Sequence, residues 1–174
     1  MKFFAVIMVA FAALTARADV ASDKMHMLLQ MASNGNVRVQ NALAWQYMRS
    51  TNAVEAMRWW RIAAEQGYSA AALNLGEAHF QGWGGVTNHV EAVKWYTVAA
   101  DMGCADAQYN LADCHENGYG VATNRVKALE LYKSAADQGV ADAKREYDRL
   151  RALLGIKSGL ESVLPTNRIP ESKE

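Results

Sequence analysis

The sequence predicts an all-α protein, an α-α solenoid of about eight helices arranged in antiparallel pairs. The first observation is a repeat of 36 residues, since Ala71–Asp106 returns as Ala107–Asp142 with no insertion or deletion. The second lies inside each copy, where two runs with apolar residues every three or four positions flank a glycine-rich loop. A fixed period of about 20 to 50 residues is typical of arrays in which each unit packs on its neighbours.

The expected units form a solenoid over residues 19–156. In order they are a half-unit at 22–35, repeats at 37–67, 69–103 and 105–139, and a capping helix at 142–154. Helices are expected at 22–33, 37–49, 53–66, 69–81, 88–102, 106–117, 124–138 and 142–154. The first repeat lacks four residues of the glycine-rich loop, so a tight turn through Ser50–Asn52 is expected instead. The charged outer face of the last helix suits a solenoid cap.

Two kinds of small residue recur for physical reasons. Asn52, Asn88 and Asn124 each precede a helical run, where the side-chain oxygen can accept a hydrogen bond from a free backbone N–H. Alanine pairs lie near the end of the second helix of each repeat, because helices packed about 8–10 Å apart leave little room for larger side chains. The pairs are Ala63-Ala64, Ala99-Ala100 and Ala135-Ala136.

Residues 1–18 have the features of a signal peptide. Lys2 precedes an apolar run from Phe3 to Leu14, and Ala16-Arg17-Ala18 fits the small-x-small cleavage pattern. The alternative is a membrane anchor, but the run is shorter than the ~20 residues that a spanning helix needs. We therefore expect an exported protein, periplasmic or secreted, with no stable membrane span after cleavage. At the other end, residues 157–174 are polar and are expected to form a flexible tail.

The charge of the chain argues against nucleic acid as a partner. The sequence has 18 basic and 18 acidic residues, so no general field attracts a polyanion. Its lysines and arginines are scattered rather than clustered on one segment.

Several short motifs recur inside the copies. They are Leu75-Gly76, Gly82-Trp83-Gly84-Gly85-Val86, Glu91-Ala92-Val93-Lys94-Trp95-Tyr96, Ala99-Ala100, Gly118-Tyr119-Gly120-Val121 and Lys127-Ala128. Together they resemble the Sel1-like repeats, which are relatives of the tetratricopeptide repeats, over residues 35–150. Ala112 departs from the family pattern, which has glycine there, and His79 and His115 replace its usual aromatic residue. The resemblance implies an adaptor or scaffold for protein partners and does not imply a reaction.

No constellation of catalytic or metal-binding residues competes with that interpretation. The glycine-rich loops lie between helices rather than after a strand, so they are not phosphate cradles. The sequence contains no Ser-x-x-Lys, Gly-x-Ser-x-Gly or His-Glu-x-x-His motif. His79 and His115 are expected to pack in their helices, each with a ring nitrogen hydrogen-bonded. Cys104 and Cys114 are expected to stay unpaired, because about 15 Å of helix between them exceeds the ~7 Å that a disulfide allows between Cα atoms. We expect no enzyme activity, no cofactor and no metal site.

A partner protein or peptide is expected to contact the first helix of each pair. In the related tetratricopeptide solenoids this helix lines a concave groove, and the equivalent positions can be counted from Leu43, Leu75 and Leu111. The residues so placed are Asn41, Trp45, Arg49, Leu73, Glu77, Gln81, Tyr109, Asp113, Asn117 and Arg145. The aromatic and apolar members among polar neighbours suit an extended peptide or a partner helix.

Two other interpretations remain open at this stage. One is a secreted effector or weak hydrolase that acts on cell-wall or host components, although no nucleophile and base are clustered in the sequence. The other is a structural spacer. Exposure of Trp45, Leu73 and Tyr109 side by side would favour the adaptor over the spacer, and burial of all three would contradict the groove.

Overall fold

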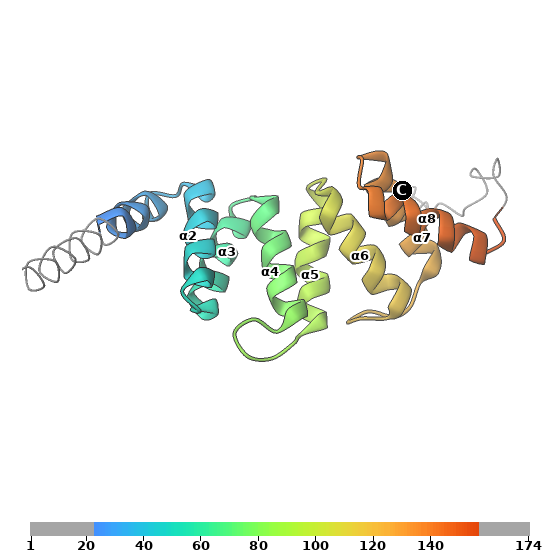
Figure 1. Ribbon diagram of the computed structural model, residues 1–174, viewed down its shortest axis with the longest axis horizontal. Coiled ribbons are helices and arrows are strands. Elements are labelled where there is room, and N and C mark those ends of the chain that lie inside the picture. Colours follow the sequence, from blue (N-terminus) through green and yellow to red (C-terminus); the bar gives the residue numbers. More distant parts are fainter. Residues whose placement is uncertain (1–22, 157–174) are drawn as a thin grey trace, which may run out of the picture.

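The computed structural model describes residues 23–156, and the regular secondary structure over that range is entirely helical (Figure 1). A helix at 23–33 is followed by seven more. These are α2 (Val37–Arg49), α3 (Ala53–Glu65), α4 (Ser69–Gln81), α5 (His89–Asp101), α6 (Ala105–Asn117), α7 (Arg125–Asp137) and α8 (Ala141–Leu153). The predicted all-α, eight-helix architecture is confirmed. The predicted signal peptide at 1–18 and tail at 157–174 lie outside the described residues.

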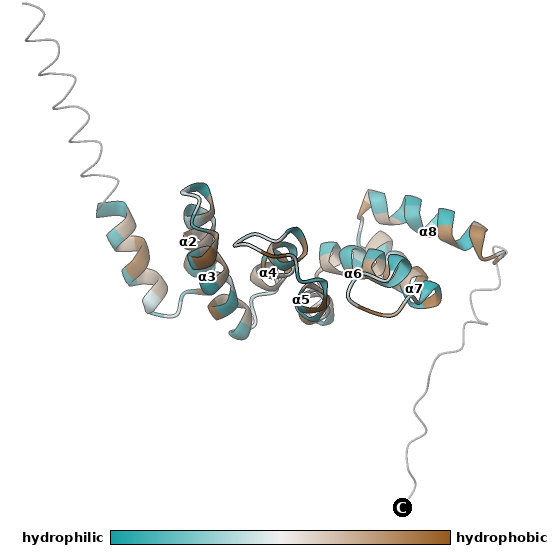
Figure 2. Ribbon diagram, turned by 90° about the horizontal axis from the view of Figure 1, so that it is seen from below, coloured by the Kyte–Doolittle hydropathy of each residue, from teal (hydrophilic) through white to brown (hydrophobic). Residues whose placement is uncertain are grey.

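The helices stand in one row along the long axis of the molecule (Figure 1). Every pair of helices in extensive contact is consecutive in sequence, from α2 with α3 to α7 with α8. Each unit is therefore stabilised by its immediate neighbours, as in a solenoid. The last helix, α8, consists largely of hydrophilic residues, which are teal in Figure 2. No helix among the described residues is long and apolar enough to cross a membrane.

Asparagine side chains begin the second helix of each repeat. The side-chain oxygens of Asn52, Asn88 and Asn124 accept hydrogen bonds of 3.2, 3.1 and 3.0 Å from the backbone N–H three residues further on. The expected capping role of these residues is confirmed. Asn36 caps α2 in the same way, with a hydrogen bond of 3.2 Å. Because these residues are caps, α5 and α7 begin one residue after them.

Large aromatic side chains and small alanines share the core. Trp60, Tyr96 and Tyr132 occupy equivalent places in the second helices and are at most 2% exposed. Around them, the alanines of the recurring pairs are buried, except that Ala136 is half-buried. The ring in the middle of each second helix fills the space between helices. The alanines near the end of that helix let its neighbours approach closely.

Candidate functional site

The residues predicted to meet a partner all keep some contact with solvent. We call these ten residues the first-helix row. Its exposed members are Trp45, Arg49, Gln81, Asn117 and Arg145, and its half-buried members are Asn41, Leu73, Glu77, Tyr109 and Asp113. Of the three apolar and aromatic members that would favour an adaptor, only Trp45 is exposed, at 42%. Leu73 and Tyr109 pack partly against the core.

The N-terminal end of the row is an aromatic cluster. The ring centroid of Trp45 lies 5.1 Å from that of the buried Trp60 and 6.5 Å from that of Trp83. Edge-to-face contacts of this kind hold the exposed indole in a defined position. Beside it, Asn41 accepts a hydrogen bond of 2.9 Å from the side-chain amide of Asn74, which ties α2 to α4.

The middle of the row converges on a small polar pocket. Three row residues, Glu77, Gln81 and Asp113, line a pocket of about 150 Å³. Its other lining residues are Phe80, Tyr96 and Asn110. We call it the acidic pocket, because two of these six side chains are carboxylates.

Hydrogen bonds fix one of the two carboxylates of the acidic pocket. The Tyr96 hydroxyl donates to Oε2 of Glu77 and the Gln81 amide donates to Oε1, each at 2.9 Å. Burial, together with the charge of Glu77, raises the pKa of Tyr96 well above its usual value, so the phenol remains a donor.

The second carboxylate belongs to Asp113. It accepts a hydrogen bond of 2.7 Å from the amide of Asn117. Burial nevertheless raises the pKa of Asp113 above its ordinary value of 3.8, because desolvation outweighs that hydrogen bond. A cation placed beside Asp113 would lower this pKa again, because a positive charge stabilises the carboxylate.

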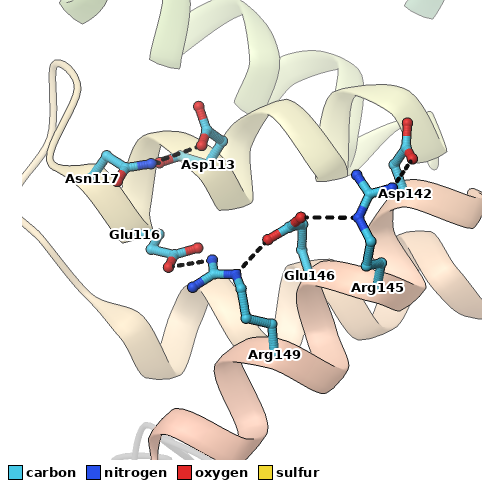
Figure 3. Close-up of polar contacts among 7 residues, drawn as sticks. All are labelled: Asp113, Glu116, Asn117, Asp142, Arg145, Glu146 and Arg149. Carbon is cyan, nitrogen blue, oxygen red and sulfur yellow. Dashed lines mark hydrogen bonds and ion pairs between the residues drawn. The ribbon is translucent and has the colours of Figure 1, made fainter.

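At the C-terminal end, an arginine joins α8 to α6 (Figure 3). Arg149 contacts Oε1 of Glu116 through Nη2 and Oε2 of Glu146 through Nε, both at 2.6 Å. The two carboxylates raise the pKa of Arg149, and Arg149 lowers the pKa of Glu146. Arg145 of the row is held on its own helix, 3.1 Å from Asp142 and 3.4 Å from Glu146.

Counting along the repeats did not identify Glu116 and Glu146 as parts of this network. A signal for it was present, because Arg149 lies 36 positions after Asp113. The row therefore changes from acidic to basic on the last helix. A charge reversal at an equivalent position is what an ion pair between successive units requires.

The histidines and cysteines show no sign of reaction chemistry. His115 hydrogen-bonds to the backbone of Ala122, as expected. Nε2 of His79 and Nδ1 of His115 are both buried without a hydrogen-bond partner. Cys104 and Cys114 are free, and burial raises the pKa of the Cys114 thiol to about 12, so it is not a nucleophile at neutral pH. Within residues 23–156 no group of three or more His, Cys, Asp or Glu side chains could hold a metal ion.

Comparison with known families gives one match that repeats along the chain. The Sel1 repeat model matches residues 37–68, 69–104 and 105–140. These three segments coincide with the helix pairs α2–α3, α4–α5 and α6–α7 together with the turns that follow them. Comparison with curated proteins found no match.

Solved structures with the same fold include a Sel1 repeat protein from Oxalobacter formigenes. It is 36% identical with a TM-score of 0.67, and the match covers 72% of this chain and 98% of that one. A second is c5321, a protective antigen present in uropathogenic Escherichia coli strains, at 26% identity and a TM-score of 0.69. That match covers 74% of this chain and 28% of the antigen. Helicobacter pylori cysteine rich protein B shares the fold at 16% identity and a TM-score of 0.58, over 69% of this chain and 92% of that one.

Proposed function

Because this chain belongs to the Sel1 repeat family, whose repeats generally serve as scaffolds for protein–protein interaction, we propose that it is an exported adaptor that binds a partner through the first-helix row. The observation that carries this proposal is the acidic pocket, where three residues of the row meet. Export is supported by the sequence features of residues 1–18. The partner is a protein or a peptide segment of one.

The chemistry of the acidic pocket favours a lysine or arginine side chain of the partner. Glu77 and Asp113 supply negative charge, while Phe80 and Tyr96 supply ring surface for the aliphatic stem of such a side chain. Asp113 is partly desolvated with only an amide as its hydrogen-bond donor, so a cation would improve its surroundings.

The molecule contains its own example of this contact. One repeat further on, Arg149 of α8 reaches the carboxylate of Glu116, whose side chain is 10% exposed. An arginine from the following unit thus satisfies an acidic group on α6. A partner's basic residue would do the same for the acidic pocket, whose six lining residues include no cation.

The exposed indole of Trp45 would provide the apolar part of the same interface. Tryptophan is enriched among the residues that contribute most to binding energy, especially when its ring is already held in place. Contacts with Trp60 and Trp83 hold this ring before any partner arrives. A partner that spans Trp45 and the acidic pocket would therefore combine an apolar residue with a basic one.

The proposal is tested with peptides, because no partner needs to be known in advance. A random library of 12-residue peptides would be selected against the chain from Asp19 to Glu174, with counter-selection against the Glu77→Gln/Asp113→Asn variant. We expect the selected peptides to be enriched in Lys or Arg and to bind that variant at least tenfold more weakly, since each charge-assisted hydrogen bond contributes about 1.5–3 kcal/mol. Trp45→Ala should weaken the same peptides.

A matched control separates this effect from a general loss of negative charge. Asp101→Asn removes an exposed carboxylate at the end of α5, outside the acidic pocket, and should leave the affinity unchanged. Thermal unfolding monitored by circular dichroism establishes that each variant is folded. Peptides without basic enrichment, or equal binding to the double variant and its parent, would contradict the first-helix row as the site.

A further inference from the structure

The loops of the two full-length repeats have equivalent sequences but different packing. In the loop 118–124, Val121 packs against the core, and a Cβ on Gly120 would overlap the backbone of His89 and Val90. In the loop 82–88, Gly85 stands at the place of Val121, with a φ of 137° and open space around a Cβ. The neighbouring Val86 is 83% exposed. The first of these loops is closed onto the helices, and the second stands open.

The open loop leaves a pocket of about 490 Å³ against α3 and α4. We call it the loop pocket. Its apolar walls include Val54, Met57 and Trp83, and its polar groups include Arg58, Arg61 and His79. This volume lies within the range of about 300–1,000 Å³ that is common for ligand sites. The acidic pocket has no lining residue in common with it.

The charges around the loop pocket leave one cation without an ion pair, although the charge of Arg61 helps to lower the pKa of Glu91. Arg58 forms an ion pair of 3.3 Å with Glu55 on its own helix. Nearby, Glu91 forms one of 2.5 Å with Lys94. Arg61 lies 5.5 Å from the ring centroid of Trp95 and makes no ion pair with any residue of the described range. The guanidinium of Arg61 therefore keeps donors for an incoming anion.

A neutral hydrogen-bonding group lies in the same wall. Nε2 of His79 is buried without a hydrogen-bond partner. The equivalent His115 also has a buried nitrogen without a partner, Nδ1, but its ring bonds to the backbone of Ala122 in the closed loop. Burial lowers the pKa of His79, although the charge of Glu91 opposes this, so the ring is neutral at pH 7. A buried polar atom without a partner is costly, and a ligand that supplies the partner recovers that cost.

We propose that the loop pocket binds an acidic segment of a partner protein, with an Asp or Glu carboxylate at Arg61 and His79 and an adjacent apolar side chain against Val54, Met57 and Trp83. Val54 is 66% exposed and Met57 and Trp83 are half-buried, so the segment would cover apolar surface that now partly faces water. This inference rests on the proposed adaptor function and adds a second contact of opposite charge. A partner that carries a basic and an acidic residue at the right separation would engage both pockets.

The test selects 12-residue peptides against the chain from Asp19 to Glu174, with counter-selection against Arg61→Gln. We expect enrichment of Asp or Glu beside an aliphatic or aromatic residue, and at least a tenfold loss of affinity on Arg61→Gln. His79→Phe keeps a ring of similar size and should also weaken the peptides. The control Arg38→Gln removes an exposed arginine of α2 and should leave their affinity unchanged.

Three results would overturn this inference. They are the absence of acidic enrichment, equal affinity for Arg61→Gln and its parent when both have the same melting temperature, and phenylacetate alone matching the peptides in affinity. The last result would make the loop pocket a small-molecule site. Binding of these peptides to Glu77→Gln/Asp113→Asn distinguishes the two proposals, because that variant removes the acidic pocket and should leave the loop pocket intact.

Discussion

The repeats at 69–103 and 105–139 share their helices and caps but differ in how a tyrosine meets a carboxylate. In the first, Tyr96 packs against Gly76 and donates to Glu77 on the next residue of α4. In the second, alanine replaces that glycine, and Tyr132 hydrogen-bonds instead to Glu116, one turn further along α6. Gly76, Glu77 and Phe80 of the first repeat correspond to Ala112, Asp113 and Glu116 of the second, so the carboxylate that the tyrosine holds changes together with these three positions.

This difference teaches where binding surfaces arise in a repeat array. Positions that follow the 36-residue period build the helix packing, and positions that break it leave groups for other partners. Glu77 and Asp113 line the acidic pocket and form no ion pair within the described residues, whereas Glu116 forms one with Arg149. The same holds for the two loops, where the open one has Trp83, Gly85 and Val86 in place of Tyr119, Val121 and Ala122.

The largest expected loss of stability comes from a substitution in the closed loop, residues 118–124. Gly120→Ala places a Cβ on top of the backbone of His89 and Val90 and also requires a non-glycine residue at a φ of 67°. We expect a loss of about 3 kcal/mol in the free energy of unfolding, from the left-handed conformation and the overlap together. Urea unfolding measures it.

The matched substitution in the open loop is Gly84→Ala. Its Cβ would lie 3.3 Å from the sulfur of Met57, a flexible side chain that can move aside. The expected loss is about 1 kcal/mol, from the φ of 90° alone. Equal losses for the two substitutions would show that the loops are packed alike.

The next prediction concerns Gly76, which has alanine at its equivalent position in the following repeat. Gly76→Ala puts a Cβ 2.5 Å from Cδ1 of Tyr96, so the ring must shift, which strains its hydrogen bond to Glu77. Overpacking of about 1–3 kcal/mol and the weakened hydrogen bond outweigh the ~1 kcal/mol that alanine gains in a helix. We expect a net loss of about 1–2 kcal/mol in urea unfolding. A gain in stability would mean that Tyr96 moves without cost.

Much of the fold follows from local rules and was predictable. Asn52, Asn88 and Asn124 could be assigned as caps because a cap depends on the next three residues only. The buried ring positions recur at the sequence period, so Trp60, Tyr96 and Tyr132 follow from it as well.

The binding surfaces were harder to predict because they depend on contacts between units. Counting along the first helices selected Glu77, Gln81 and Asp113, which meet in one pocket, but the Tyr96 side of that pocket comes from another helix. The loop pocket depends on the backbone path at Gly85, which a residue count does not give. The ion pair of Arg149 with Glu116 joins residues 33 positions apart, so a residue count indicates a cation on α8 but not which carboxylate it meets.

A smaller difference in stability is expected between substitutions of His79 and His115. His115→Phe removes a hydrogen bond to Ala122 and should cost about 1 kcal/mol at pH 7.5. His79→Phe should be neutral or slightly stabilising, because it removes a buried ring nitrogen that has no hydrogen-bond partner. Thermal unfolding of the two variants gives the comparison, and a larger loss for His79→Phe would show that its ring nitrogen has a function in folding.

The same histidines set the sign of a pH dependence. Burial lowers the pKa of both below the ordinary value of 6.5. As the pH falls through 6.5, the unfolded chain takes up protons that the folded rings resist, so stability decreases. The melting temperature should therefore fall between pH 7.5 and 5.5, and less so in a variant with both histidines replaced by phenylalanine. An unchanged slope in that variant would assign the pH dependence to other groups.

The smallest differences in stability are expected for ion pairs, one that joins two units and one that lies within a single helix. Arg149→Gln removes the cation that joins α8 to α6 and leaves Glu116, at 10% exposure, with the hydroxyl of Tyr132 as its remaining donor. We expect a loss of about 0.5–1 kcal/mol, the upper range for exposed pairs, because half of the arginine is solvated. Lys144→Gln breaks only the exposed pair with Asp148 on α8 and should lower the free energy of unfolding by less. Urea unfolding at low salt compares the two variants.

Only the pair of Arg149 with Glu116 links two units, so only its loss should also weaken the packing of α8 on the rest of the solenoid. Amide hydrogen exchange in α8 should then be faster in Arg149→Gln than in Lys144→Gln. Equal exchange in both variants would show that Arg149 does not anchor the last unit.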